Sequence, residues 1–177
     1  MRVLLHSCCA PCSTTVIERL KKDYDITVIF YNPNIEPEEE YLKRKKTQIE
    51  FLKKQNIPHI EIEYLNEEFT NFIQGYESEP EKGKRCYFCF ELRLSKTALM
   101  AKQKGFDYFA TTLSISPHKN TKIINEIGED LARSLNIKYL NENFKSHDGF
   151  KRSLELSKEH DLYRQNYCGC RYSSKGA

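Results

Sequence analysis

The chain of 177 residues contains no long hydrophobic run. Its first apolar segment ends at His6, and no later segment approaches the ~18 apolar residues that a membrane-spanning helix needs. Nothing at its start resembles a secretory signal peptide. We therefore expect a soluble, cytoplasmic protein that does not associate with a membrane.

A strong excess of one charge is also missing. The chain has 28 basic and 25 acidic residues, which give a net charge of +3 at pH 7. This balance is compatible with nucleic-acid binding, but a dedicated binder often carries a larger basic excess. The length fits one domain, residues 1–177, whose core is large enough to fold without disulfides. No internal repeat or low-complexity segment divides it.

A glycine-rich phosphate-binding loop is absent as well. ATP-using proteins of the architecture predicted below carry such a loop after the first strand. Here residues 6–12 read HSCCAPC instead, so we infer no ATP binding. The chain has seven cysteines in three groups: Cys8, Cys9 and Cys12; Cys86 and Cys89; Cys168 and Cys170. In a reducing cytosol, this grouping and the odd number indicate metal or redox chemistry rather than a disulfide framework.

Hydrophobic periodicity predicts alternating strands and helices. The predicted strands are 2–7, 25–31, 60–65, 107–113 and 137–140, and the predicted helices are 14–20, 37–55, 67–75, 86–104, 120–135 and 153–160. This order is typical of an α/β fold, a parallel sheet with helices on both faces. Ligands bind such folds beyond the carboxyl ends of the strands, so we expect residues 6–12 and 111–120 to face one crevice. Residues 163–177 have no clear period and form a predicted cysteine-bearing tail.

The spacing of the cysteines suggests one composite site. Cys8, Cys9 and Cys12 stand at a predicted helix start, where a lowered thiol pKa favours thiolate ligands. Cys86 and Cys89 form a CxxC pair, a spacing that zinc sites, iron–sulfur clusters and redox pairs all use. Because 78 residues separate Cys8 from Cys86, a local zinc finger is disfavoured. Four pooled thiolates would suit either an iron–sulfur cluster or zinc.

The third cysteine group is a CxC pair in the tail. The spacing of Cys168 and Cys170 suits either a strained, easily reduced disulfide or two ligands of one metal. Basic residues near the cysteines are candidate phosphate contacts: Arg85, Arg93, Lys96 and Arg171. Tyr167, which flanks the CxC pair, could contact a nucleotide. Candidate proton donors are His118, His6 and Asp148, and the sequence leaves the choice open; a structural role suits His6 equally well.

Four separated motifs together resemble one family. HSCCAPC, RCYFCFELRL, TTLSISPHKN and YCGCRYS occur in this order over nearly the whole chain. The combination is similar to the QueH-type epoxyqueuosine reductases. The resemblance implies a Rossmann-like sheet related to the adenine nucleotide α-hydrolases (HUP-like). It also implies the last step of queuosine biosynthesis, in which the epoxide of epoxyqueuosine at the tRNA wobble position is reduced.

The resemblance further implies the cofactors and site residues. The family uses a [4Fe–4S] cluster and a nearby mononuclear iron, without cobalamin. Carried over by motif, the cluster ligands are Cys8, Cys9, Cys86 and Cys89, and the redox-active pair is Cys168 and Cys170. Cys12 is left to help hold the second iron, with Cys168 or Cys170 as the alternative. The implied partners are a tRNA bearing epoxyqueuosine and an electron donor that the sequence does not identify. A base turned out of the anticodon loop would then stack on an aromatic residue such as Tyr87, Phe88 or Tyr167.

Two other function classes fit parts of this pattern. A tRNA thiolation enzyme of the same architecture also uses a cysteine-ligated cluster, but it should carry the ATP loop that this chain lacks. A zinc-stabilised RNA-binding protein would explain four of the cysteines but has no need of seven. The metal and sulfide content of the purified protein would separate these alternatives.

Overall fold

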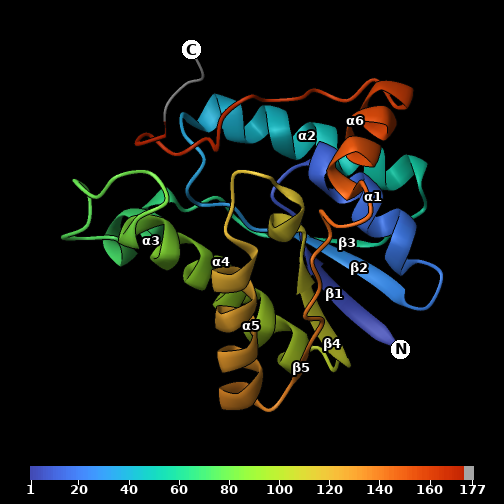
Figure 1. Cartoon of the computed structure of the whole chain (residues 1–177), viewed down its shortest axis with the longest axis horizontal. Coiled ribbons are helices and arrows are strands. Elements are labelled where there is room, and N and C mark those ends of the chain that lie inside the picture. Colours follow the sequence, from blue (N-terminus) through green and yellow to red (C-terminus); the bar gives the residue numbers. More distant parts are fainter. Residues whose placement is uncertain (174–177) are drawn as a thin grey trace.

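The computed structural model describes residues 1–173 (Figure 1). Within them, one parallel sheet has the strand order β3-β2-β1-β4-β5. Its strands are β1 (Arg2–His6), β2 (Asp25–Phe30), β3 (His59–Glu61), β4 (Tyr108–Thr111) and β5 (Lys138–Tyr139). The expected α/β fold is therefore confirmed. The described residues contain no helix that is both long and apolar enough to cross a membrane.

Helices cover both faces of the sheet. They are α1 (Ala10–Leu20), α2 (Glu38–Lys54), α3 (Asn66–Phe72), α4 (Lys84–Gln103), α5 (Thr121–Leu135) and α6 (Gly149–Glu159), with a 3-10 turn, η1, at Thr112–Ile115. Alternate residues of the central strand β1 point to opposite faces. Val3 and Leu5 pack with α1 and α2, while Leu4 packs with α4 and α5. All three side chains are fully buried, as expected for a strand covered on both sides.

Four helices, α1, α3, α4 and α6, begin earlier than the periodicity predicted, and at α1 and α4 the difference involves cysteines. The first helix starts at Ala10 rather than residue 14, because Pro11 fits the first helical turn, where its missing N–H costs nothing. Cys9 is therefore the N-cap residue and Cys12 lies within the helix. The helix predicted at 86–104 starts at Lys84, so Cys86 and Cys89 both lie in its first turns.

The tail crosses the top of the sheet along α2. Figure 1 shows the red C-terminal segment running beside this helix. Tyr163 donates a hydrogen bond to Glu40, and the Glu36 backbone N–H donates to the carbonyl oxygen of Gly169 at 2.8 Å. These contacts bring the CxC segment over the carboxyl ends of the strands. The predicted tail extends to residue 177, and its last four residues lie outside the described part.

Candidate active site

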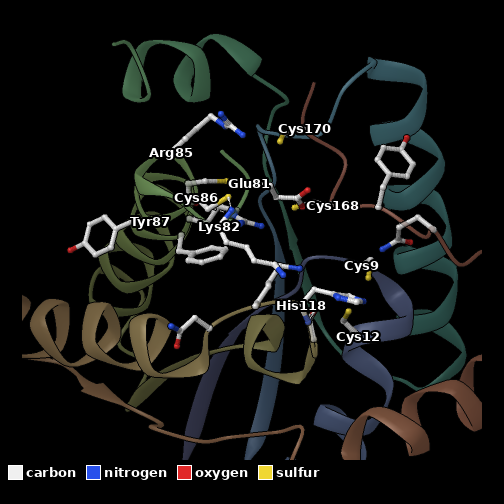
Figure 2. Close-up of a pocket in the computed structure, with 18 of the residues that line it drawn as sticks. Cys9, Cys12, Glu81, Lys82, Arg85, Cys86, Tyr87, His118, Cys168 and Cys170 are labelled. Atoms are coloured by element: carbon white, nitrogen blue, oxygen red, sulfur yellow. Dashed lines mark hydrogen bonds between the residues drawn. The ribbon is translucent and has the colours of Figure 1, made fainter. Parts of the chain in front are cut away.

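One crevice at the carboxyl end of the sheet gathers the cysteines. It encloses about 570 Å³ and is lined by six of them: Cys9, Cys12, Cys86, Cys89, Cys168 and Cys170. They come from the β1–α1 turn and start of α1, the start of α4, and the tail (Figure 2). His118 and Lys119, from the loop after β4, complete the lining. The expectation that residues 6–12 and 111–120 face a common crevice is therefore confirmed. We call it the cysteine crevice.

Three sulfur atoms converge at the start of α1. The Sγ atoms of Cys8, Cys9 and Cys12 all lie within 4.8 Å of one another. Hydrogen bonds with the Cys12 and Cys9 thiols hold the pKa of Cys8 well below its ordinary value. The pKa of Cys12 is raised well above its ordinary value by its hydrogen bonds to Cys8 and Cys9 and by burial. Such a trio of thiols is a suitable donor set for one soft metal ion or one face of a metal–sulfur cluster.

A second cysteine group faces this trio. It consists of Cys86 and Cys89, one turn apart on α4, with Cys168 and Cys170 of the tail. Cys170 packs beside Cys89 against Phe69. Burial, and then the nearby Cys168, Cys170 and Cys86, raise the pKa of Cys89 to about 12, although the positive charge of Arg93 acts to lower it. All seven cysteines lie in the described part of the chain, and each is a free thiol.

The basic residues predicted to contact phosphate do not form one group. Lys96 is ion-paired with Glu68 at 3.5 Å, and Arg171 with Glu36 at 2.5 Å. Arg85 and Arg93 line the crevice, but both are buried, so neither is positioned to meet a phosphate in solvent. The prediction of phosphate contact is therefore wrong for the two buried arginines, Arg85 and Arg93, and stays a prediction for Lys96 and Arg171. Periodicity explains the error for Arg93, which follows Cys86 and Cys89 on the inner face of α4.

The three proton-donor candidates are separated by the fold. His118 is exposed and lines the cysteine crevice. His6 is fully buried between Thr111 Oγ1 and the Tyr31 carbonyl oxygen, each 3.0 Å from a ring nitrogen, and burial lowers its pKa to about 4. Asp148 lines a different, polar cavity beside α1 and α6. The structure thus gives His6 the structural role and leaves His118 as the candidate in the crevice.

The aromatic candidates divide in a similar way. Tyr87 and Tyr167 line the cysteine crevice, and Tyr87 is 38% exposed. Phe88 instead packs against Phe72 and Tyr76 outside the crevice lining. Two tyrosines are therefore available to a planar ligand, and Phe88 serves the packing of α3 on α4.

The sequence did not single out two basic residues at this site. Lys119 lies next to His118, and its pKa is raised by Cys168, Cys8 and Cys12 despite the opposing effect of burial. Arg44 of α2 donates from Nη1 to the carbonyl oxygen of Cys168 at 2.9 Å. The sequence could have marked Lys119 as a site residue, because it follows the candidate His118 within the motif TTLSISPHKN. Arg44 lies in a run of four basic residues, 43–46, within a charged helix, and nothing in the sequence distinguished it from its neighbours.

Comparison of the sequence with known proteins relates the chain to a family. The model of the family described as epoxyqueuosine reductase QueH matches residues 3–176. The chain is 45% identical to an epoxyqueuosine reductase QueH from Streptococcus pyogenes serotype M1, covering 98% of this chain and 70% of that protein. It is 36% identical to one from Thermotoga maritima, covering 97% and 89%.

Two solved structures share the fold at low sequence identity. One is a predicted subunit of tRNA methyltransferase from Methanocaldococcus jannaschii, with a TM-score of 0.60, 18% identity and coverage of 90% of this chain and 74% of that one. The other is the U34-tRNA thiolase NcsA from Methanococcus maripaludis with its [4Fe-4S] cluster, with a TM-score of 0.59, 15% identity and coverage of 97% and 61%. At these identities the likeness shows a shared Rossmann-like α/β fold alone.

Proposed function

Because this chain belongs to the epoxyqueuosine reductase QueH family, we propose that it reduces the epoxide of epoxyqueuosine at the wobble position of tRNA to the cyclopentene of queuosine. The reaction removes one oxygen atom. It consumes two electrons and two protons and releases one water. The observation that carries the proposal at this site is the convergence of cysteines from three distant segments on one crevice.

The crevice fits an iron–sulfur centre. Its donor set is thiol-rich, and three sulfurs already lie within 4.8 Å of one another. We assign Cys8, Cys9, Cys86 and Cys89 as ligands of a [4Fe–4S] cluster and Cys12 as a ligand of an additional iron. The Sγ atom of Cys12 also lies within 4.8 Å of those of Cys8 and Cys9, which makes Cys12 the alternative cluster ligand. When bound, such a centre would supply one-electron transfer and a Lewis-acidic iron.

The tail contains a pair of thiols that can provide the electrons and protons that the reduction consumes. Oxidation of Cys168 and Cys170 from two thiols to one disulfide releases two electrons and two protons, which is what epoxide deoxygenation consumes. An external one-electron reductant, acting twice with two protons, returns the disulfide to thiols. Gly169 between them has φ +108°, a conformation that suits glycine and that lets the chain turn tightly between the two thiols.

Protonation of the leaving oxygen is assigned to the loop after β4. His118 is an exposed imidazole on the crevice wall, so it can take up a proton from solvent and deliver it inside. Lys119 beside it keeps its charge, because the neighbouring thiols Cys168, Cys8 and Cys12 raise its pKa. The proposed roles therefore differ, with proton transfer at His118 and electrostatic support at Lys119.

Binding of the substrate requires the modified base to leave the stack of the anticodon loop. Tyr87 and Tyr167 offer aromatic faces on the crevice lining, where an extruded base can stack. Lys82, exposed at the same crevice, is available to the phosphate backbone. This arrangement supports a single-stranded nucleotide as the part of the tRNA that enters.

The test is metal analysis followed by a direct assay. Protein purified without oxygen should contain iron and acid-labile sulfide, with about four irons per chain in the cluster and one more beside it. With dithionite as the reductant, it should remove one oxygen from epoxyqueuosine in tRNA, as read by mass spectrometry of the nucleosides. Zinc without sulfide would favour the zinc-stabilised RNA-binding protein. ATP-dependent sulfur incorporation into tRNA would favour the thiolation enzyme.

A further inference from the structure

A fully buried guanidinium stands beside the cysteine crevice. Arg93 of α4 is 2% exposed and ranks first by volume among the fully buried side chains. Among residues 1–173, no carboxylate oxygen lies within 4.0 Å of it, since it takes part in none of the ion pairs of the described chain. Burial of an unpaired charge is costly, and a folded protein normally neutralises it with a partner. The partner of Arg93 must therefore come from another kind of group.

The hydrogen bonds of Arg93 leave one nitrogen unused. Its Nε donates to the carbonyl oxygen of Cys89 at 3.0 Å, and Nη1 to Asn32 Oδ1 at 3.4 Å. Both acceptors are neutral. Nη2 is buried and has no hydrogen-bond partner in the described part of the chain. Because Arg93 also lines the cysteine crevice, this donor is available to whatever the crevice holds.

Its charged and titratable neighbours on the facing elements are mostly sulfurs. Cys89, Cys168, Cys8 and Cys170 all favour its charged form. Lys119 has the same sign as Arg93, and His6 on β1 is held neutral by burial, so neither can compensate the guanidinium. The negative charge that balances Arg93 therefore has to reside on these sulfurs and on what they bind.

We propose that Arg93 is the buried counter-charge of the metal–sulfur centre, a positioning residue that donates from Nη2 toward its sulfur atoms and raises its reduction potential. The inference rests on the proposed function, because it requires that the crevice hold such a centre. The sign follows from electrostatics. Each added electron makes the centre more negative, so a fixed cation stabilises the reduced form more than the oxidised form. Because Arg93 is buried, bulk solvent screens this interaction less than it would at the surface.

The first experiment measures the midpoint potential of the loaded protein by a redox titration followed by EPR. Arg93→Gln should shift the potential to more negative values and increase iron loss to a chelator about 10- to 100-fold, as loss of a supporting partner of a metal site does. Arg93→Lys keeps the charge and should restore most of the potential. Arg164→Gln is the matched control, because Arg164 is an exposed cation on the same crevice lining. Its potential should equal that of the parent.

A second variant changes the charge without shortening Arg93. Asn32→Asp is nearly isosteric and places a carboxylate at the atom that already accepts from Nη1, with loss of the hydrogen bond that Asn32 Nδ2 donates to the Ser7 carbonyl oxygen at 2.8 Å. The guanidinium then gains an internal partner, and the potential should again become more negative. An unchanged potential in both Arg93→Gln and Asn32→Asp overturns the inference while leaving the proposed function intact. A parent protein without any iron–sulfur centre overturns both.

The metal-free protein covers the case in which Arg93→Gln fails to assemble a centre. An uncompensated buried charge destabilises the fold when the centre is absent. Metal-free Arg93→Met should therefore unfold at the same temperature as the metal-free parent or at a higher one. If Arg93 only supported packing, its replacement by Met should instead lower the unfolding temperature of the metal-free protein. A clearly lower unfolding temperature for metal-free Arg93→Met therefore rejects the counter-charge role.

Discussion

Arg44 of α2 holds Cys168 in place from a distance of 124 residues along the chain, through a 2.9 Å hydrogen bond from Nη1 to the Cys168 carbonyl oxygen. The same guanidinium is ion-paired with Glu40 at 2.6 Å and stacks over the Tyr167 ring at 5.0 Å. The otherwise irregular tail is thereby fastened to a helix of the core. The CxC segment gains a fixed position without belonging to any helix or strand.

Loss of this fastening should expose the tail thiols. A hydrogen bond from a charged donor contributes about 1.5–3 kcal/mol, so Arg44→Met should increase the open population of the tail roughly tenfold or more. The measurement is the rate at which a bulky thiol reagent labels Cys168 and Cys170 in the metal-free protein. Lys46→Met is the matched control, because it removes an exposed charge of the same helix whose ion pair is with Glu50 of that helix. Equal labelling rates in the two variants would show that Arg44 does not hold the tail.

The neighbouring glycine is predicted to be intolerant of a side chain. Gly169 has φ +108°, and a Cβ there would lie 2.8 Å from Arg44 Nη1. Gly169→Ala should therefore displace the CxC segment and reduce turnover, while the metal centre, if held by the other cysteines, keeps its iron and sulfide. Gly75→Ala is a suitable control, since its φ is also positive but open space surrounds it. Full turnover in Gly169→Ala would argue against a catalytic role for the tail geometry.

Single cysteine variants should sort the thiols into three roles. Cys8→Ala should lose the whole centre, because Cys8 belongs to the converging trio and its lowered pKa favours a thiolate. Cys12→Ala should keep sulfide and lose about one iron per chain, and Cys170→Ala should keep the full centre yet lose turnover. Iron, sulfide and activity are measured on the same samples. Loss of sulfide in Cys12→Ala would make Cys12 a cluster ligand, and loss of colour in Cys170→Ala would do the same for Cys170.

The parts of this site that were predictable from sequence are those that local patterns encode. β-Branched and aromatic runs marked the buried strands, and the apolar run at residues 2–7 placed HSCCAPC at a strand end. The contacts of arginines were not predictable, because their partners are distant in sequence. Arg93 reaches Asn32 across 61 residues, and its exposure depends on which face of α4 meets the sheet. Arg93 was interpreted as a phosphate contact because most arginines in proteins are exposed, whereas this one is buried.

The position of Cys12 shows the same limit. The sequence separated Cys12 from Cys8 and Cys9 only through a family motif, whereas in the structure α1 begins early enough to bring all three sulfurs together. Likewise, His6 and Asp148 could not be distinguished from His118 until the sheet placed the first inside the core and α6 carried the second to another cavity.

His118 should affect the rate more than binding. If it delivers the proton to the leaving oxygen, His118→Gln should lower kcat by about 10²- to 10⁴-fold, the range for loss of a general acid. Its KM and iron content should change little, because an exposed side chain supports neither the core nor the centre. His147→Gln is the control, an exposed histidine that lines the other cavity. Steady-state kinetics on modified tRNA decides the matter, and an unchanged kcat in His118→Gln would exclude it as the proton donor.

Tyr87 should contribute to tRNA binding through the face of its ring. It follows Cys86 directly on α4, is 38% exposed and lines the crevice. Stacking of one base on an aromatic side chain contributes about 1–3 kcal/mol, so Tyr87→Ala should weaken binding roughly 5- to 150-fold. Tyr87→Phe keeps the ring and should bind nearly as well as the parent.

Leu99→Ala provides the matched control, because it shortens another exposed apolar residue of α4 outside the crevice lining. Binding is measured by titration with an anticodon stem-loop at fixed salt, since the phosphate contribution changes with ionic strength. If Tyr87→Phe binds as weakly as Tyr87→Ala, the hydroxyl rather than the ring recognises the substrate, and the base does not stack at this position. If both bind like the parent, the extruded base must rest on Tyr167 instead, and Tyr167→Ala should then show the loss expected here.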